Sequence, residues 1–143
     1  MSDVIHVLPA DRNAAYDQFN ISPATLCGNL LLVSGLIGLR PDGSIADTLQ
    51  EQIELIFEQA KSVLKEAGGS FADIASFETY HAGDVAVLDQ MTAFMAVRDR
   101  YVQRPGPAWT SIGVSSLALP GTLIEVKITA YIGRSVGAFA VTR

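Results

Sequence analysis

The sequence predicts an α+β domain in which two helices cover one face of a β-sheet. Apolar residues recur at helical spacing in 49–67 and again in 87–101, whereas in 123–132 they alternate with polar residues, as is typical of a strand. Turn signals rich in glycine and proline separate these segments. A chain of 143 residues with 49% apolar content can bury one core, so we expect a single domain over 1–143, with 134–143 as a C-terminal tail.

The first half of the chain predicts a buried strand and then a helix. A turn signal at 27–29 precedes the apolar run Leu30–Val33, which is typical of a short buried strand. We expect Asp47 to cap the helix that follows, and Gly68-Gly69 to end it. The apolar face of this helix consists of residues three or four positions apart: Leu49, Ile53, Ile56, Ala60, Val63 and Ala67.

A second strand and a second helix come next. The segment 73–83, DIASFETYHAG, has the β-branched and aromatic content of a strand that closes at Gly83. Asp84 is the expected cap of the second helix, and Pro105 and Pro107 forbid its continuation. Its apolar stripe is predicted to be Val87, Met91, Phe94, Val97 and Tyr101.

The last third predicts two strands. The turn signal LPGT at 119–122 favours an antiparallel hairpin between 108–117 and 123–132. In the last strand, Glu125 and Lys127 fall on a mixed face opposite the apolar one, and in the strand before it Trp109 and Ser111 share a face. With both helices on one side of the sheet, the other side needs a different cover. A symmetric homo-oligomer is the expected solution.

Composition excludes several classes of function. The chain carries 10 basic and 15 acidic residues, a net charge of -5, with the basic residues scattered, so we expect no nucleic-acid partner. One cysteine, Cys27, and two histidines make a poor metal set, and we expect no metal. No apolar stretch approaches the ~20 residues of a membrane span, and the N-terminus lacks the pattern of an export signal. A reduced cytoplasmic protein without membrane contact is expected.

Three stretches together carry a resemblance to a known family. These are LLLVSGLIGL before the first helix, AWTSIGV after the second, and LIEVKITAYI near the end. With the order of elements, they resemble the YjgF/RidA family, and most of all its YjgH-like branch. The resemblance implies a chorismate-mutase-like fold with a mixed sheet, a homotrimer, and three clefts between subunits. It also implies hydrolysis of imines and enamines derived from amino acids, without metal or cofactor.

The chain departs from the family pattern where deaminating members hold their substrate. Trp109 stands in place of the arginine of a P-A-R-S stretch that grips the substrate carboxylate, and Ser111 aligns with a common cysteine. The family's E-I-E run aligns with 125–127, which puts Lys127 at the carboxylate that positions water. A tyrosine of the cleft aligns with Ile21. An indole cannot make the two charge-assisted bonds of a guanidinium, so 2-iminobutanoate deaminase activity is expected to be altered or lost.

The residues that remain predict a site for a small anionic metabolite. Lys127 would hold a carboxylate as a point charge, Trp109 would form a flat wall of the pocket, and Glu125 is the nearest acid or base. The resemblance also implies that backbone N–H groups at Ser34-Gly35 and Ser111 grip ligand oxygens. The alternatives are that Trp109 packs in the core or an interface and that Lys127 and Glu125 form an exposed charge pair.

Three functions stay open at this point. One is an enzyme acting on a small metabolite in clefts between subunits, and the second is a non-catalytic module on the same scaffold that binds a metabolite or stabilises a protein. The third is the ribonuclease or translation-inhibitor role attached to some family names, which the acidic composition disfavours. His81 could shuttle protons, although its place in the strand pattern favours a satisfied, partly buried histidine.

Overall fold

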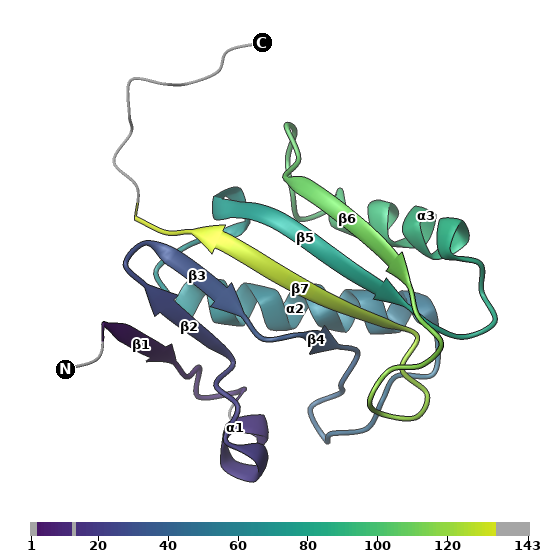
Figure 1. Ribbon diagram of the computed structural model, residues 1–143, viewed down its shortest axis with the longest axis horizontal. Coiled ribbons are helices and arrows are strands. Elements are labelled where there is room, and N and C mark those ends of the chain that lie inside the picture. Colours follow the sequence, from purple (N-terminus) through teal and green to yellow (C-terminus); the bar gives the residue numbers. More distant parts are fainter. Residues whose placement is uncertain (1–2, 13, 134–143) are drawn as a thin grey trace.

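A seven-stranded sheet forms one layer of the molecule, and helices cover one of its faces (Figure 1). The computed structural model describes residues 3–12 and 14–133, so the predicted tail at 134–143 lies outside the described residues. The helical elements are α1 (Ala14–Phe19), α2 (Leu49–Glu66), the 3-10 turn η1 (Phe71–Asp73) and α3 (Val87–Arg98). The strands are β1 (Val4–Val7), β2 (Ala24–Cys27), β3 (Leu30–Val33), β4 (Leu36–Ile37), β5 (Ile74–His81), β6 (Ala108–Gly113) and β7 (Ile124–Tyr131).

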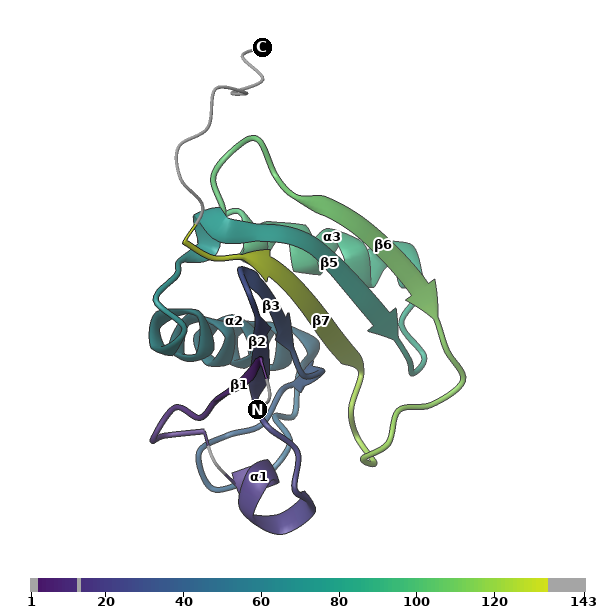
Figure 2. The ribbon, with the colours of Figure 1, turned by 60° about the vertical axis from the view of Figure 1, so that its left-hand side comes forward.

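Helices α2 and α3 pack on the same face of the sheet, as predicted, and the opposite face carries neither of them (Figure 2). Phe57 of α2 lies 5.4 Å from Phe94 of α3 and 6.0 Å from Phe77 of β5, measured between ring centroids. All three rings are buried. The core therefore lies between the two helices and the sheet, which confirms the predicted α+β class.

Strand β7 runs through the middle of the sheet and shows the predicted alternation. Ile124, Val126 and Ile128 are buried against the helices, whereas Glu125 and Lys127 between them are partly exposed on the other face. The sheet order is β1-β2-β3-β7-β5-β6, with β4 also paired to β7. Residues directly opposite each other on paired strands share a face, so the register assigns every strand residue to the core or to the uncovered side.

The predicted hairpin between the last two strands is wrong. Strand β6 pairs with β5 and runs parallel to it, while β7 pairs antiparallel with the other side of β5. The physical reason is the helix between β5 and β6, because a strand, a helix and a second strand form a crossover that returns the chain in the same direction. The segment 114–123 then carries the chain past the end of β5 to reach β7.

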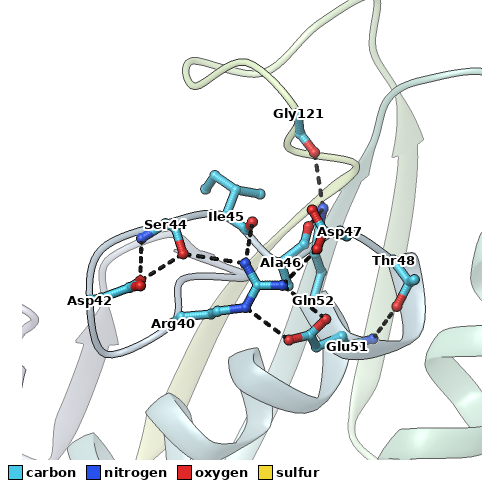
Figure 3. Close-up of polar contacts among 10 residues, drawn as sticks. All are labelled: Arg40, Asp42, Ser44, Ile45, Ala46, Asp47, Thr48, Glu51, Gln52 and Gly121. Atoms are coloured by element: carbon cyan, nitrogen blue, oxygen red, sulfur yellow. Dashed lines mark hydrogen bonds and ion pairs between the residues drawn. The ribbon is translucent and has the colours of Figure 1, made fainter.

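The start of α2 differs from the prediction in one residue. Thr48, not Asp47, is the cap, and its Oγ1 accepts a hydrogen bond from the N–H of Glu51 at 3.2 Å. Asp47 instead accepts a bond from Arg40 Nη2 at 3.0 Å, and Arg40 Nε also bonds Glu51 at 3.1 Å (Figure 3). The guanidinium thereby ties the loop before α2 to the first turn of the helix. The predicted end at Gly68 is confirmed, with Gly68 at φ +81° just beyond the helix.

The start of α3 also differs from the prediction. Asp84 does not cap the helix, which begins later, at Val87, and its N-cap residue Ala86 makes no side-chain cap bond. The buried positions of α3 are Gln90, Phe94 and Val97, so a polar residue occupies the first place of the buried stripe.

Within 3–12 and 14–133, no helix combines the length and the apolar character that a membrane span requires.

Candidate functional site

The uncovered face of the sheet holds the charged residues singled out from the sequence. Lys127 lies opposite Glu78 of β5, and Glu125 lies opposite Tyr80, so all four side chains share this face. Ile37 of β4 lies beside Glu125 on its other side. We call this side of the sheet, marked by Glu78, Tyr80, Glu125 and Lys127, the open face.

The Glu125 carboxyl lies directly over Gly35. Glu125 Oε2 is 2.5 Å from the position that a Cβ atom at residue 35 would occupy, so only glycine leaves room for the carboxyl in this place. Burial raises the pKa of Glu125 above its ordinary value. A carboxyl of this kind gives up and takes back a proton closer to neutral pH than an exposed one, which suits an acid or base.

Lys127 is the cation of the open face. Its Nζ donates a long hydrogen bond of 3.4 Å to the carbonyl of Val33 at the end of β3. Among the residues that the structure describes, Lys127 takes part in no ion pair, although Glu78 and Glu125 lie on the same face. Its charge is therefore available to an anion that approaches this face.

Ser34 and Gly35 differ in what they can offer a ligand. The N–H of Ser34 donates to the carbonyl of Pro23 at 2.9 Å, and its hydroxyl donates to the carbonyl of Ser22 at 2.6 Å. Neither donor of Ser34 is free, so the expected backbone grip cannot come from this residue. The N–H of Gly35 has no hydrogen-bond partner within the described part of the chain, and Gly35 is exposed. The ligand contact predicted for Gly35 stays a prediction.

Trp109 lies on the helix-covered face, not on the open face. It is opposite Phe77 of β5, its ring centroid is 5.1 Å from that of Phe94, and the guanidinium of Arg98 lies 5.7 Å from the indole. The indole N–H donates to Thr79 Oγ1 at 2.9 Å. One protomer therefore does not bring Trp109 and Lys127 into a common pocket. Trp109 has this position because β6 pairs with β5. The hairpin predicted from the sequence pairs β6 with the last strand and therefore places Trp109 beside Lys127.

Ser111 is on the same face as Trp109, at the edge of the sheet. Its hydroxyl lies 2.9 Å from His81 Nε2 and 3.0 Å from Thr79 Oγ1. The N–H of Val114 donates to the backbone carbonyl of His81 on β5 at 2.9 Å. In a parallel strand every second residue bonds the same neighbour, so the residues between them have their N–H groups on the other side. The N–H of Ser111 therefore points to the outer edge of β6, where no further strand of the described residues follows. The ligand contact predicted for Ser111 requires an N–H in this direction, and the contact itself stays a prediction.

His81 is buried, with partners for both ring nitrogens, which agrees with the structural alternative for this residue. Nε2 lies 2.7 Å from Thr79 Oγ1, and Nδ1 lies 3.0 Å from Gln90 Oε1. Desolvation lowers the pKa of His81, and the hydrogen bond with Gln90 opposes this only in part, so the ring is neutral near pH 7. Sequence reasoning missed Gln90, although a glutamine four positions before Phe94 on an apolar stripe is a detectable signal.

Residues 3–12 and 14–133 contain no group of three or more histidine, cysteine, aspartate or glutamate side chains that could hold a metal ion. Cys27 is exposed and far in sequence from both histidines.

The fold and the open face define a class: small α+β proteins in which helices cover one face of the sheet and the other face carries polar side chains. A family model described as Endoribonuclease L-PSP matches residues 11–132. RutC family protein YjgH of Escherichia coli is 35% identical over 127 residues, or 88% of this chain and 93% of YjgH. A RutC family protein of Pyrococcus abyssi is 29% identical over 112 residues, or 77% of this chain and 84% of that protein.

Solved structures agree with these relatives. A structure of protein YjgH superposes with a TM-score of 0.81 at 32% identity and covers 94% of this chain and 100% of its own. The structure of RidA from an Antarctic Psychrobacter gives 0.67 at 26% identity, covering 92% and 97% of the two chains. The chain belongs to the YjgF/RidA family, which confirms the resemblance drawn from its sequence.

Proposed function

We propose that this chain is a RidA-like protein that binds a small anionic metabolite in clefts between the subunits of a homotrimer. In these clefts it hydrolyses an imine or enamine, with 2-iminobutanoate deaminase activity altered or lost. The observation that carries the proposal is the half-buried Glu125 carboxyl, held against Gly35 and next to Lys127 on a face that no helix covers. No metal or cofactor takes part in the proposed reaction.

The reaction needs one group that exchanges protons. Water adds to the imine carbon while Glu125 takes a proton from it, and the same proton passes to the nitrogen. Glu125 next takes the proton of the new hydroxyl group and passes it to the same nitrogen as the C–N bond breaks, which yields the keto compound and ammonia. The raised pKa of Glu125 supports this role, since the group must be able both to accept and to return a proton near neutral pH.

Lys127 supplies the charge that selects an anionic ligand. It lies two residues from Glu125 on the same face, roughly 7 Å along the strand. An ammonium holds a carboxylate as a point charge, without the fixed geometry of a guanidinium fork. We therefore expect a looser choice among small carboxylates than a bidentate arginine would give.

The residue at position 109 supports a change of activity. Trp109 stands where deaminating relatives have an arginine, and its indole is turned toward Phe94 and Thr79 on the covered face. Two charge-assisted bonds to the substrate carboxylate are lost, roughly 3–6 kcal/mol together, partly offset where Lys127 reaches the same group.

Exposed apolar residues on the open side of the sheet support the homotrimer. Val4, Leu30 and Tyr131 lie in one row across neighbouring strands through Cys27, and their exposed fractions are 38%, 40% and 45%. Ile112 on β6 is exposed on the same side. An apolar row of this kind is stabilised by burial against further copies of the chain.

A second candidate is a non-catalytic metabolite-binding or protein-stabilising module on the same trimeric scaffold. The inward orientation of Trp109 favours it, because among the described strand residues of the open face Lys127 is then the cation, and none of them supplies a guanidinium fork to orient a substrate for attack. A cytoplasmic location fits both candidates. The net charge of -5 disfavours the ribonuclease activity in the family model's description.

An assay coupled to an amino-acid oxidase, which releases imino acids directly into the reaction, tests the two candidates. The proposal predicts slow hydrolysis of 2-iminobutanoate, with faster hydrolysis of another imino acid in a panel. Glu125→Gln should abolish the hydrolysis but not the binding of the keto acid, and Lys127→Met should weaken the binding. Binding without any hydrolysis would favour the second candidate, and rates for 2-iminobutanoate equal to those of arginine-bearing relatives would contradict the proposal.

A further inference from the structure

A network of hydrogen-bonded side chains lies on the covered face, where β5, β6 and α3 meet. Trp109 Nε1 donates to Thr79 Oγ1 at 2.9 Å, and Thr79 Oγ1 lies 3.0 Å from Ser111 Oγ. Both hydroxyls reach His81 Nε2, at 2.7 Å for Thr79 and 2.9 Å for Ser111. Thr79, His81 and Gln90 are each at most 1% exposed, whereas Ser111 is partly exposed. The network therefore reaches from the buried residues to Trp109 and Ser111 on the edge strand β6, both of which are partly exposed.

The position of the protons on His81 follows from Gln90. The amide nitrogen of Gln90 donates to the carbonyl of Ala82 at 2.7 Å, so its oxygen is the atom that faces His81 Nδ1. An amide oxygen only accepts, and Nδ1 must therefore carry the proton. Nε2 is then the unprotonated nitrogen, and it faces the hydroxyl of Ser111.

Two arrangements of the hydroxyl protons satisfy every donor. Ser111 donates to His81 while Thr79 donates to Ser111, or Ser111 donates to Thr79 while Thr79 donates to His81. In the first arrangement a proton that leaves Ser111 reaches Nε2 directly, and in the second it passes through Thr79. Both routes end on the same base, so Ser111 is coupled to His81 in either case.

We propose that Ser111 is the nucleophile of a second site on this chain, with His81 as its base and Gln90 as the residue that positions His81, and that this site accepts acyl groups from small activated esters. A hydroxyl, a neutral imidazole and an amide that holds the imidazole are the parts that an activated nucleophile requires. The N–H of Ser111, directed to the free edge of β6, is placed to donate to the oxygen that becomes negative during attack.

The proposed reaction balances without any added reagent. Ser111 Oγ forms a bond to the carbonyl carbon of the ester, and its proton moves to His81 Nε2. The bond from that carbon to the leaving oxygen then breaks, and the leaving oxygen takes the proton from Nε2. Water, giving a proton to the same nitrogen, later releases the acid and restores Ser111. The orienting group is a neutral amide, so we expect a slow reaction that needs a good leaving group such as an aryl oxide.

This site is separate from the open face. Ser111 and His81 lie on the covered side of the sheet, and Glu125 and Lys127 lie on the other. Loss of one activity therefore leaves the other unchanged. Glu125→Gln should leave acyl transfer intact, and His81→Gln, a change on the covered face, should leave the binding of keto acids intact.

Reaction of the intact protein with p-nitrophenyl acetate tests the proposal. We expect a burst of p-nitrophenolate of about one equivalent per chain, and peptide mass spectrometry should find one acetyl group on Ser111. Ser111→Ala should lose the burst completely. The matched control is Ser115→Ala, which removes an exposed serine hydroxyl four residues further along and should leave the burst unchanged.

His81→Gln should slow acetylation about a hundredfold or more, as expected for loss of a general base. Thr79→Val should preserve the burst, because Ser111 still reaches His81 directly. The emission of Trp109, which is part of the same network of hydrogen bonds, reports whether each variant is folded. Acetylation on a lysine or on Cys27 in place of Ser111, an undiminished burst in Ser111→Ala, or the absence of any burst would overturn the proposal.

Discussion

Gly35 determines where the Glu125 carboxyl can lie on the open face. A methyl group at residue 35 would come within 2.5 Å of Glu125 Oε2. Gly35→Ala should therefore displace the carboxyl, at small cost to stability because a flexible side chain can move aside. A displacement of about 1 Å at a reacting group can cost about a hundredfold in rate, and we expect a loss of this order in imine hydrolysis.

Gly106→Ala is the matched control for that change, since a methyl group there meets no atom within 4 Å. Both variants can be compared by thermal unfolding and by the coupled assay. Similar unfolding temperatures with activity lost only in Gly35→Ala are expected. Equal activities would show that the position of Glu125 does not matter to the reaction.

Glu125 should also leave a signature in the dependence of stability on pH. The pKa of its carboxyl is raised in the folded protein, so the folded chain binds this proton more tightly than the unfolded chain does. The free energy of unfolding should then fall as pH rises from the ordinary value of 4.5 through the raised pKa. Below pH 4.5 the carboxyl is protonated in both the folded and the unfolded chain, so its burial causes no loss of stability there.

Urea unfolding of the wild type and of Glu125→Gln at several pH values measures this contribution. The difference in unfolding free energy between the two proteins should change in favour of the variant as pH rises through the window, because glutamine does not ionise. A difference that stays constant across the window would mean that the carboxyl is not desolvated in the folded protein.

At the scale of elements, the sequence patterns predicted most of the secondary structure. The spacing of apolar residues predicted α2 and α3, and the alternation in β7 placed Glu125 and Lys127 on one face, because both depend on local geometry. The pairing of β6 could not be obtained from the turn signal after it. That pairing depends on the crossover through α3, and it is what separates Trp109 from Lys127.

Trp109 should accordingly behave as a structural residue that joins β6 to α3. Trp109→Phe keeps the contact with Phe94 and removes the hydrogen bond to Thr79, a loss of about 1 kcal/mol in the free energy of unfolding. Trp109→Ala removes the ring as well, and about 3 kcal/mol should be lost. Chemical denaturation provides both values.

Fluorescence adds an independent check on the same residue. Small carboxylates that bind the open face should leave the emission of Trp109 unchanged, because the indole lies on the opposite side of the sheet. A strong change in emission on binding, together with wild-type stability of Trp109→Ala, would place the indole in the ligand pocket instead.

At the scale of the whole molecule, the uncovered face should be buried by other copies of the chain. Light scattering is expected to give the mass of a trimer at micromolar concentration. Leu30→Asp places a charge in the exposed apolar row of the open side and should produce monomers. Leu88→Asp, at an outer position of α3 that is 70% exposed, is the matched control and should remain trimeric. A monomeric wild type would remove the proposed clefts.

The location of a bound keto acid tests most directly whether the open face around Glu125 and Lys127 is the metabolite site. A crystal structure with 2-oxobutanoate, the product expected from 2-iminobutanoate, should place the carboxylate within hydrogen-bond distance of Lys127 Nζ and the keto carbon next to Glu125 and Gly35. Density for the ligand on the covered face, beside Trp109 and Arg98, or an open face that stays free of ligand at saturating concentration, would contradict this assignment of the metabolite site.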